Sequence, residues 1–297
     1  MDTLELMQKV RSIRILTRRL VDERLSGDYH TSFKGKGIEF DEIREYQFGD
    51  DVRSIDWNVT ARTGVPQIKC YTEERQLTVQ FLIDVSGSLN FGSGTRTKAD
   101  LAAEIAALLA FTSIHNQDNV GLILFSDRIV KEISPQRGRN AVSRIVREIL
   151  SSAENATGKT NIAEALHRLE TVQHRRSVVF LISDFQDDGY DTALARIARK
   201  HDLICCTVSD PAERNLPNAG MLELTDPETG ETRWIDLSSR KLRDAFAEQV
   251  KQADEALQDR FLRSHVSTMR FSTDVDPIDA IRSFFRRRAN RRLRHRA

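Results

Sequence analysis

The residues best suited to chemistry form one short pattern, D-V-S-G-S at Asp84, Ser86 and Ser88, which directly follows an apolar run. The pattern places one carboxylate and two hydroxyl groups at alternating positions. Such a set of oxygen atoms could bind a metal ion, supply a nucleophile, or only close a turn after a strand. A later apolar run also ends in an acid, Asp184. The relative position of the two acids therefore decides which chemistry is available.

The elements that must position these acids are short apolar runs that alternate with helical patterns. The runs cover residues 77–83, 120–125, 177–182 and 203–208, and a last strand is expected over 266–273. Nearly continuous apolar runs of this length are typical of strands buried on both faces of a parallel sheet. The alternation predicts an α/β fold with a doubly wound, mostly parallel six-stranded sheet of Rossmann-like type.

In a doubly wound sheet, ligands bind beyond the carboxyl ends of the strands, where the strand order reverses. With the common order 3-2-1-4-5-6, Asp84 and Asp184 end neighbouring strands. Two close carboxylates raise each other's proton affinity, and a divalent cation relieves the repulsion. An all-oxygen ligand set favours Mg²⁺, with Mn²⁺ or Ca²⁺ as alternatives, over Zn²⁺. An ion held by few carboxylates remains short of negative charge, so we expect it to accept a carboxylate from outside.

The pattern D-x-S-x-S resembles the metal-ion-dependent adhesion site of von Willebrand factor type A (vWA) domains. In that family a threonine from a later loop and an aspartate after the fourth strand complete the site. The stretches "ATGKTNIAEAL" and "FLISD" are similar to these two elements. The resemblance implies a vWA-like fold with a metal site formed by Asp84, Ser86, Ser88, Thr160 and Asp184.

One position departs from the family pattern. Family members often have glycine after the second aspartate, but here Phe185 follows, with Asp187 and Asp188 close behind. A bulky ring and additional acids beside the ion would alter access to it. We therefore predict that Phe185, Asp187 and Asp188 contribute to partner binding.

Enzymatic interpretations of the same residues fit less well. The stretches "GSGT" at 92–95 and "GKT" at 158–160 lack the spacing of a dinucleotide-binding loop or a P-loop. Asp84 resembles the nucleophile of haloacid dehalogenase-like phosphatases, but Ser86 replaces the second acid of their D-x-D motif. The four histidines between His115 and His201 have no metal-ligand spacing. We therefore expect no catalytic residue and no small-molecule substrate, with a metal-dependent phosphohydrolase using Asp84 as the alternative.

The segment from 34 to 64 is dense in acids, arginines and aromatic residues. Alternating charges of this kind predict internal ion pairs that fix an irregular segment, packed on a neighbour rather than around its own core. The residues assigned this structural role are Glu39, Arg44, Tyr46, Asp50, Asp51, Arg53, Asp56, Trp57 and Arg62.

The same segment carries a second resemblance. The patterns G-x-G-x-E-F and R-x-Y-x-x-G-D-D-x-R-x-I-D-W, and "TDVDPIDAIRSFFRRR" near the C-terminus, resemble the bacterial domain-of-unknown-function 58 family. In that family the segment precedes a vWA domain, and no catalytic activity is established. The family is commonly associated with MoxR-type AAA+ ATPases. The resemblance implies a non-catalytic adaptor or co-chaperone whose partner is such an ATPase or its client.

The remaining sequence predicts three parts: an N-terminal extension over 1–76, the vWA-like domain over 77–288, and a basic tail over 289–297. A helix is expected over 1–26, ended by "SGDY". A hairpin is expected over 221–237, and then a long helix from Leu242 to Phe261, capped by Ser238 or Ser239.

Charge, cysteine content and hydropathy limit the partners and the compartment. The net charge is +1, which gives no general preference for nucleic acid or membranes. Seven arginines between 286 and 296 leave a nucleic-acid or anionic-surface binder as an alternative, although a solvated helix end is the simpler interpretation. No apolar stretch reaches the roughly 20 residues of a membrane span. Cys205 and Cys206 are expected in the core, and few cysteines indicate a reducing compartment, so we predict a cytoplasmic protein.

Overall fold

The computed structural model describes residues 25–33, 39–72, 77–154, 158–225 and 232–294. The chain divides into two compact units. One unit spans Phe33–Gln76, and the other comprises the residues before it and the chain from Leu77 onward. The shorter unit is a compact cluster of contacts, and its predicted packing on a neighbour stays a prediction. Among the described residues, no helix has both the length and the apolar character needed to cross a membrane.

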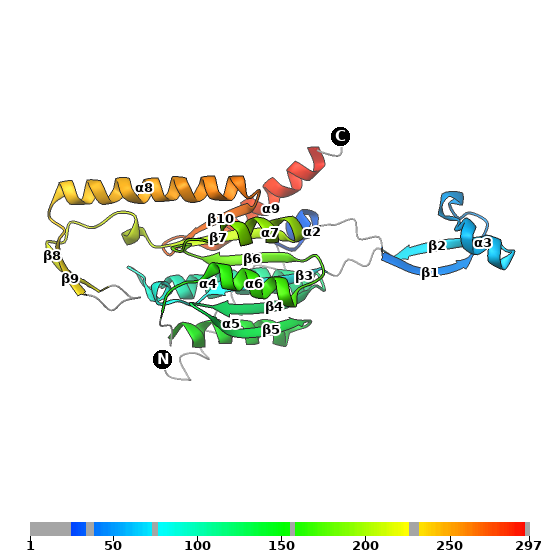
Figure 1. Cartoon of the computed structure of the whole chain (residues 1–297), viewed down its shortest axis with the longest axis horizontal. Coiled ribbons are helices and arrows are strands. Elements are labelled where there is room, and N and C mark those ends of the chain that lie inside the picture. The colour runs from blue at the N-terminus through cyan, green and yellow to red at the C-terminus, as the bar shows by residue number, and fades with distance from the viewer. Residues whose placement is uncertain (1–24, 34–38, 73–76, 155–157, 226–231, 295–297) are drawn as a thin grey trace. The chain divides into compact units, whose positions relative to one another are not determined.

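The larger unit contains a six-stranded sheet of order β10-β7-β6-β3-β4-β5 (Figure 1). In chain order the strands are β3 (Thr78–Asp84), β4 (Asn119–Phe125), β5 (Ile129–Gln136), β6 (Val178–Ser183), β7 (Asp202–Ser209) and β10 (Ser267–Ser272). All neighbours are parallel except β4 and β5. Read from the β5 edge, the order is 3-2-1-4-5-6, so the predicted α/β fold and strand order are confirmed.

Helices cover both faces of the sheet because the strands are apolar on both sides. Helices α6 (Ile162–Val172) and α7 (Asp191–Lys200) pack on one face in a core that includes Leu166, Leu181 and Leu194. Helix α4 (Lys98–His115) contacts α5 (Arg139–Glu154), α9 (Pro277–Arg294) and the sheet strands β3, β4 and β7. Cys205 and Cys206 are fully buried in β7, as expected.

Residues Ser26–Phe33 form helix α2, so the prediction that "SGDY" ends a helix is wrong. Tyr29 and Phe33 are buried, and the Tyr29 hydroxyl donates a 2.8 Å hydrogen bond to Asp118. The Tyr29 ring also meets the ring of Phe285 edge-on. These tertiary contacts outweigh the low helix propensity of the serine and glycine at the start of α2. The helix predicted before residue 25 lies outside the described residues.

The C-terminal elements follow the prediction. Strands β8 (Met221–Thr225) and β9 (Thr232–Asp236) form the antiparallel hairpin, whose turn lies outside the described residues. Helix α8 (Arg240–Arg263) begins after Ser239, whose hydroxyl accepts a hydrogen bond from the Leu242 amide. Helix α9 continues to Arg294, so most of the predicted basic tail is helical, and Arg288 forms an ion pair with Asp202.

The shorter unit contains the antiparallel strands β1 (Glu39–Glu45) and β2 (Gln67–Thr72). Between them lie the short helix η2 (Val52–Ser54) and helix α3 (Trp57–Thr63). Both terminal nitrogens of the Arg44 guanidinium donate 2.8 Å hydrogen bonds to the Asp50 carboxylate, which confirms an internal ion pair.

The other charged residues of this unit act mainly at helix starts. Asp51 accepts a hydrogen bond from the Arg53 amide. Asp56 caps α3 and pairs with Lys69 at 2.9 Å. Within the described part of the chain, Arg53 and Arg62 form no ion pair. The predicted structural role of these two arginines therefore stays a prediction.

Candidate metal site at the carboxyl ends of β3 and β6

The two acids singled out in the sequence end neighbouring strands. Asp84 is the last residue of β3, Asp184 directly follows β6, and Ile83 pairs with Ile182 across the two strands. Strand β4 lies on the other side of β3, so the chain leaves β3 and β6 in opposite directions along the sheet. The site lies where the strand order reverses, which is the expected ligand position in this class of fold.

Oxygen atoms from two loops converge beside Asp84. The Thr160 hydroxyl lies 2.9 Å from the Ser86 hydroxyl and 3.3 Å from the Asp84 carboxylate. The Ser86 and Ser88 hydroxyls are 3.1 Å apart. Asp84 and Ser86 are fully buried, and Ser88 and Thr160 are only 6% and 8% exposed. Four of the five predicted ligands are thus connected by hydrogen bonds.

Backbone contacts hold the two loops in place. The amide of Val85 donates to the carbonyl of Phe125, and the Ser86 amide donates to Asp84 at 2.9 Å. The loop that carries Thr160 is fixed by the Asn161 amide, which donates to the Ser126 carbonyl at 2.8 Å. Gly158 in that loop has φ +101°, a conformation that favours glycine. The hydroxyl groups are therefore positioned by the fold itself.

The environment of Asp84 disfavours its charged form. Burial raises the pKa of Asp84 to about 6, and the negative charge of Asp184 acts in the same direction. The Ser183 hydroxyl opposes this shift with a 2.7 Å hydrogen bond to the Asp84 carboxylate. The sequence analysis missed Ser183, although a serine at the end of an apolar strand, directly before an acid, was a usable signal.

The fifth predicted ligand, Asp184, has a cationic neighbour that the sequence analysis also missed. The ammonium group of Lys98 donates to Asp184 at 2.8 Å and to Glu213 at 2.5 Å. Lys98 is fully buried at the start of α4. Burial alone would lower the pKa of Lys98, but the two adjacent carboxylates outweigh it and raise that pKa. Lys98 therefore supplies an internal positive charge at the edge of the site.

Phe185 is buried in the core, whereas a role in partner binding predicts an exposed side chain. Its side chain is only 5% exposed, and its ring meets Phe261 edge-on with centroids 5.0 Å apart. Its φ of +60° is uncommon for a residue with a side chain, because this left-handed region favours glycine. The burial of the ring compensates for the strained backbone.

The two acids that follow Phe185 differ in role. Asp187 accepts a 2.8 Å hydrogen bond from the amide of Ile162 at the start of α6, so it is tied to the element after Thr160. Asp188 is 96% exposed and contacts Arg260 at 3.2 Å. Asp188 therefore remains accessible at the rim of the site.

The donor set fits a hard cation. Among the described residues, no group of three or more histidines, cysteines or acids is arranged around a metal position. Any ion at Asp84 would therefore depend on two carboxylates and three hydroxyl groups, which are oxygen donors of the kind that Mg²⁺ and Ca²⁺ prefer. The raised pKa of Asp84 marks a carboxylate that a cation would stabilise in its charged form.

Several known proteins are similar to this chain in sequence or in structure. An uncharacterized protein of Mycobacterium tuberculosis is 31% identical over 248 residues, covering 83% of this chain and 78% of its own. An aerotolerance-related membrane protein from Bacteroides fragilis is 15% identical, with 72% of this chain and 99% of that chain covered and a TM-score of 0.48. The VWA domain of SpRpn10 is 14% identical, with 45% of this chain and 75% of that chain covered and a TM-score of 0.33.

The family comparison gives the assignment. A family described as "Protein of unknown function DUF58" matches residues 42–256, which is more than half of the chain. The mycobacterial relative, also above 30% identity, is covered over more than two thirds of its length. The chain belongs to the DUF58 family.

Proposed function

We propose that this protein is a non-catalytic protein-binding module that uses a Mg²⁺ site at Asp84. The observation that carries the proposal is the convergence of the Thr160, Ser86 and Ser88 hydroxyls beside a buried carboxylate with a raised pKa.

The proposed ligands are Asp84, Ser86, Ser88, Thr160 and Asp184. Mg²⁺ takes six oxygen ligands, so five protein groups would leave one coordination position, which a partner could fill. Lys98 shares its single positive charge between Asp184 and Glu213. Asp84 would be the one carboxylate at the ion without a cationic neighbour among the described residues, so the open coordination position would still accept a carboxylate from a partner protein.

The partner is proposed from the family resemblance and from this charge argument. An aspartate or glutamate on a MoxR-type AAA+ ATPase, or on a client of that ATPase, would complete the coordination of the ion. The protein would then act as an adaptor that connects ATPase and client. Exposed Asp188 at the rim would limit which acidic segments approach closely.

The two alternatives have weaker support. A phosphohydrolase would need Asp84 as an accessible nucleophile, but Asp84 is fully buried, and both its oxygens accept hydrogen bonds. A nucleic-acid binder would use the arginines of α9. Arg288, however, pairs with Asp202 and contacts the Phe284 ring, so it serves internal packing.

Calorimetric titration with Mg²⁺ tests the metal claim. Wild type should give a binding heat that Asp84→Ala abolishes, whereas Asp259→Asn, which removes an exposed acid of α8, should bind like wild type. Equal heats for wild type and Asp84→Ala would refute the site.

Capture of the ATPase in Mg²⁺ and in EDTA tests the partner claim. Capture that depends on Mg²⁺ and on Asp84 is expected. Capture that is unchanged in EDTA would show that the metal site is not the contact.

A further inference from the structure

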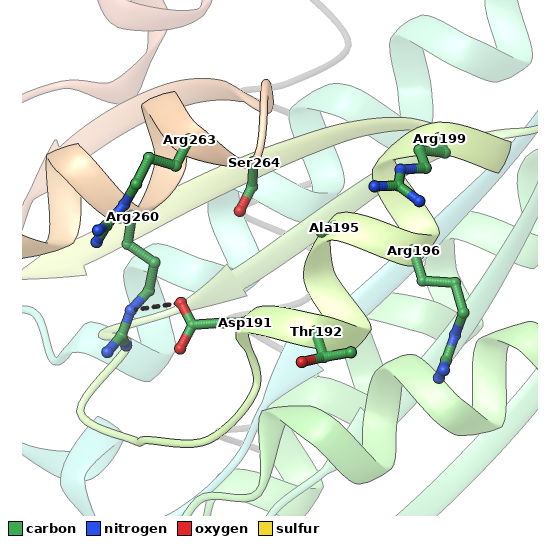
Figure 2. A pocket seen from close by; sticks show the side chains of 8 residues that line it. All are labelled: Asp191, Thr192, Ala195, Arg196, Arg199, Arg260, Arg263 and Ser264. Atoms are coloured by element: carbon green, nitrogen blue, oxygen red, sulfur yellow. Dashed lines mark ion pairs between the residues drawn. The ribbon is translucent and has the colours of Figure 1, made fainter.

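Helix α7 and the end of α8 border an open pocket of about 700 Å³ (Figure 2). The pocket is lined by four arginines and one acid, Asp191. Two of the arginines, Arg196 and Arg199, come from α7, and the other two, Arg260 and Arg263, come from α8. The pocket is separate from the candidate metal site, since none of the five proposed ligands lines it. Its lining carries a clear excess of positive charge.

The spacing of the arginines explains why they face the same space. Residues three apart on a helix lie on the same side, and each helix contributes one such pair. The opposite side of α7 is fixed in the core by Leu194 and Ile197. Phe261 anchors α8 in the same core, beside Arg260. The arginine cluster is therefore held by packed elements on both sides.

Two of the four guanidinium groups have structural partners. Arg260 pairs with Asp191 at 3.0 Å and lies 4.8 Å over the Tyr190 ring, and Arg196 pairs with Glu170 at 3.0 Å. Within the described residues, Arg199 and Arg263 form neither an ion pair nor a side-chain hydrogen bond, and both are exposed. These two charges are available for a ligand.

We propose that this pocket binds an acidic peptide segment of a protein partner. Guanidinium groups bind carboxylates through paired hydrogen bonds, which gives both affinity and orientation. A volume of about 700 Å³ lies in the range of pockets that hold ligands of many atoms and exceeds the need of one small anion. None of the lining residues is aromatic, so the pocket offers no surface on which a nucleobase could stack.

The lining supports a peptide in a second way. Thr192 and Ser264 add hydroxyl groups beside the arginines. Hydroxyls can donate to or accept from the amides and carbonyls of an extended chain. Carboxylates would then bind Arg199 and Arg263 while the peptide backbone contacts the hydroxyls. This binding needs no metal ion, so it succeeds or fails independently of the Asp84 site.

Fluorescence anisotropy with labelled hexaglutamate and the full-length protein tests the proposal. We expect the double variant R199Q/R263Q to bind at least tenfold more weakly than wild type. The matched control R175Q/R176Q removes two exposed arginines from the loop before β6 and should bind like wild type. Binding should weaken as salt increases and stay unchanged in EDTA. Equal melting temperatures would confirm that both variants are folded.

Three results would overturn the proposal. One is equal hexaglutamate affinity for wild type and R199Q/R263Q. Another is an equal loss in R199Q/R263Q and R175Q/R176Q, which would indicate general charge attraction. The third is that hexaglutamate does not bind. The ligand would then not be an acidic peptide, whether or not polyphosphate or anionic phosphatidylserine vesicles bind.

Discussion

The Nζ atom of Lys98 lies 2.8 Å from Oδ2 of Asp184, and both side chains are almost completely buried. Glu213 accepts a second hydrogen bond from the same ammonium group. A buried charge is tolerated only when it is paired and hydrogen-bonded. The candidate site therefore combines Asp184, which has a cationic partner, with Asp84, which has none among the residues that the structure describes.

The substitution Lys98→Met should destabilise the protein by about 3–5 kcal/mol, because it leaves two acids unpaired. Added Mg²⁺ should restore part of this loss, since the ion replaces the missing positive charge. Thermal unfolding with and without Mg²⁺ measures both effects. Lys251→Met, which removes an exposed lysine of α8, should change stability by less than about 1 kcal/mol. Unchanged stability in Lys98→Met would contradict the structural role of the pair.

Mg²⁺ affinity should depend on pH through Asp84. The ion binds the charged carboxylate, and the pKa of Asp84 is raised to about 6 by burial and by Asp184. Affinity should therefore fall by about tenfold per pH unit below 6, because the proton and the ion compete. Titrations at pH 5, 6 and 7 measure this slope. Constant affinity across that range would argue that the ion does not bind Asp84 directly.

Asp118 should make a separate contribution to stability. Burial raises the pKa of Asp118 to about 6, although hydrogen bonds from Tyr29 and the Leu77 amide oppose the shift. A carboxyl group with a raised pKa in the folded state stabilises the fold below its unfolded pKa of about 4. That stabilisation is lost as the pH rises through 6. The full stabilisation is up to about 3 kcal/mol, which corresponds to a pKa difference of about two units between the folded and unfolded states.

The variant Asp118→Asn isolates this contribution. Denaturant unfolding in EDTA measures the free energy of unfolding of wild type and of Asp118→Asn. The advantage of wild type over the variant in this free energy should be larger at pH 4. The advantage should decrease by pH 7. A difference between the two proteins that does not change with pH would show that Asp118 does not titrate in this range.

Phe185 should behave as a core residue with a strained backbone. Removing its ring in Phe185→Ala should cost about 3–5 kcal/mol of folding free energy. Phe185→Gly should cost slightly less than alanine, because glycine adopts φ +60° without strain. Chemical unfolding measures both values. Near-native stability combined with lost partner capture would instead support the original prediction that Phe185 contacts a partner.

The strands and their order could be predicted because continuous apolar runs and alternation with helices are local signals. The edge strand β5 was not located, since charged residues such as Lys131 and Glu132 interrupt its apolar pattern. Helix α2 was mistaken for a break because its stability comes from contacts of Tyr29 with Asp118 and Phe285, which are distant in sequence. Tertiary contacts of this kind leave no local pattern.

The site was predictable to a similar extent. The spacing of Asp84, Ser86 and Ser88 is local, the expected strand order placed Asp184 beside them, and the family resemblance added Thr160. Lys98 was missed because only the fold brings the start of α4 to the end of β6. The burial of Phe185 was missed because its packing partner, Phe261, lies on a helix far along the chain.

The segment that follows Asp184 is attached at three points to two different elements, α8 and α6. Phe185 inserts into the core against α8, Asp187 binds the first amide of α6, and Asp188 contacts Arg260. A rim held in this way has its binding shape before any partner arrives. Association should therefore proceed as a single bimolecular step whose rate increases linearly with partner concentration, without a plateau set by loop closure.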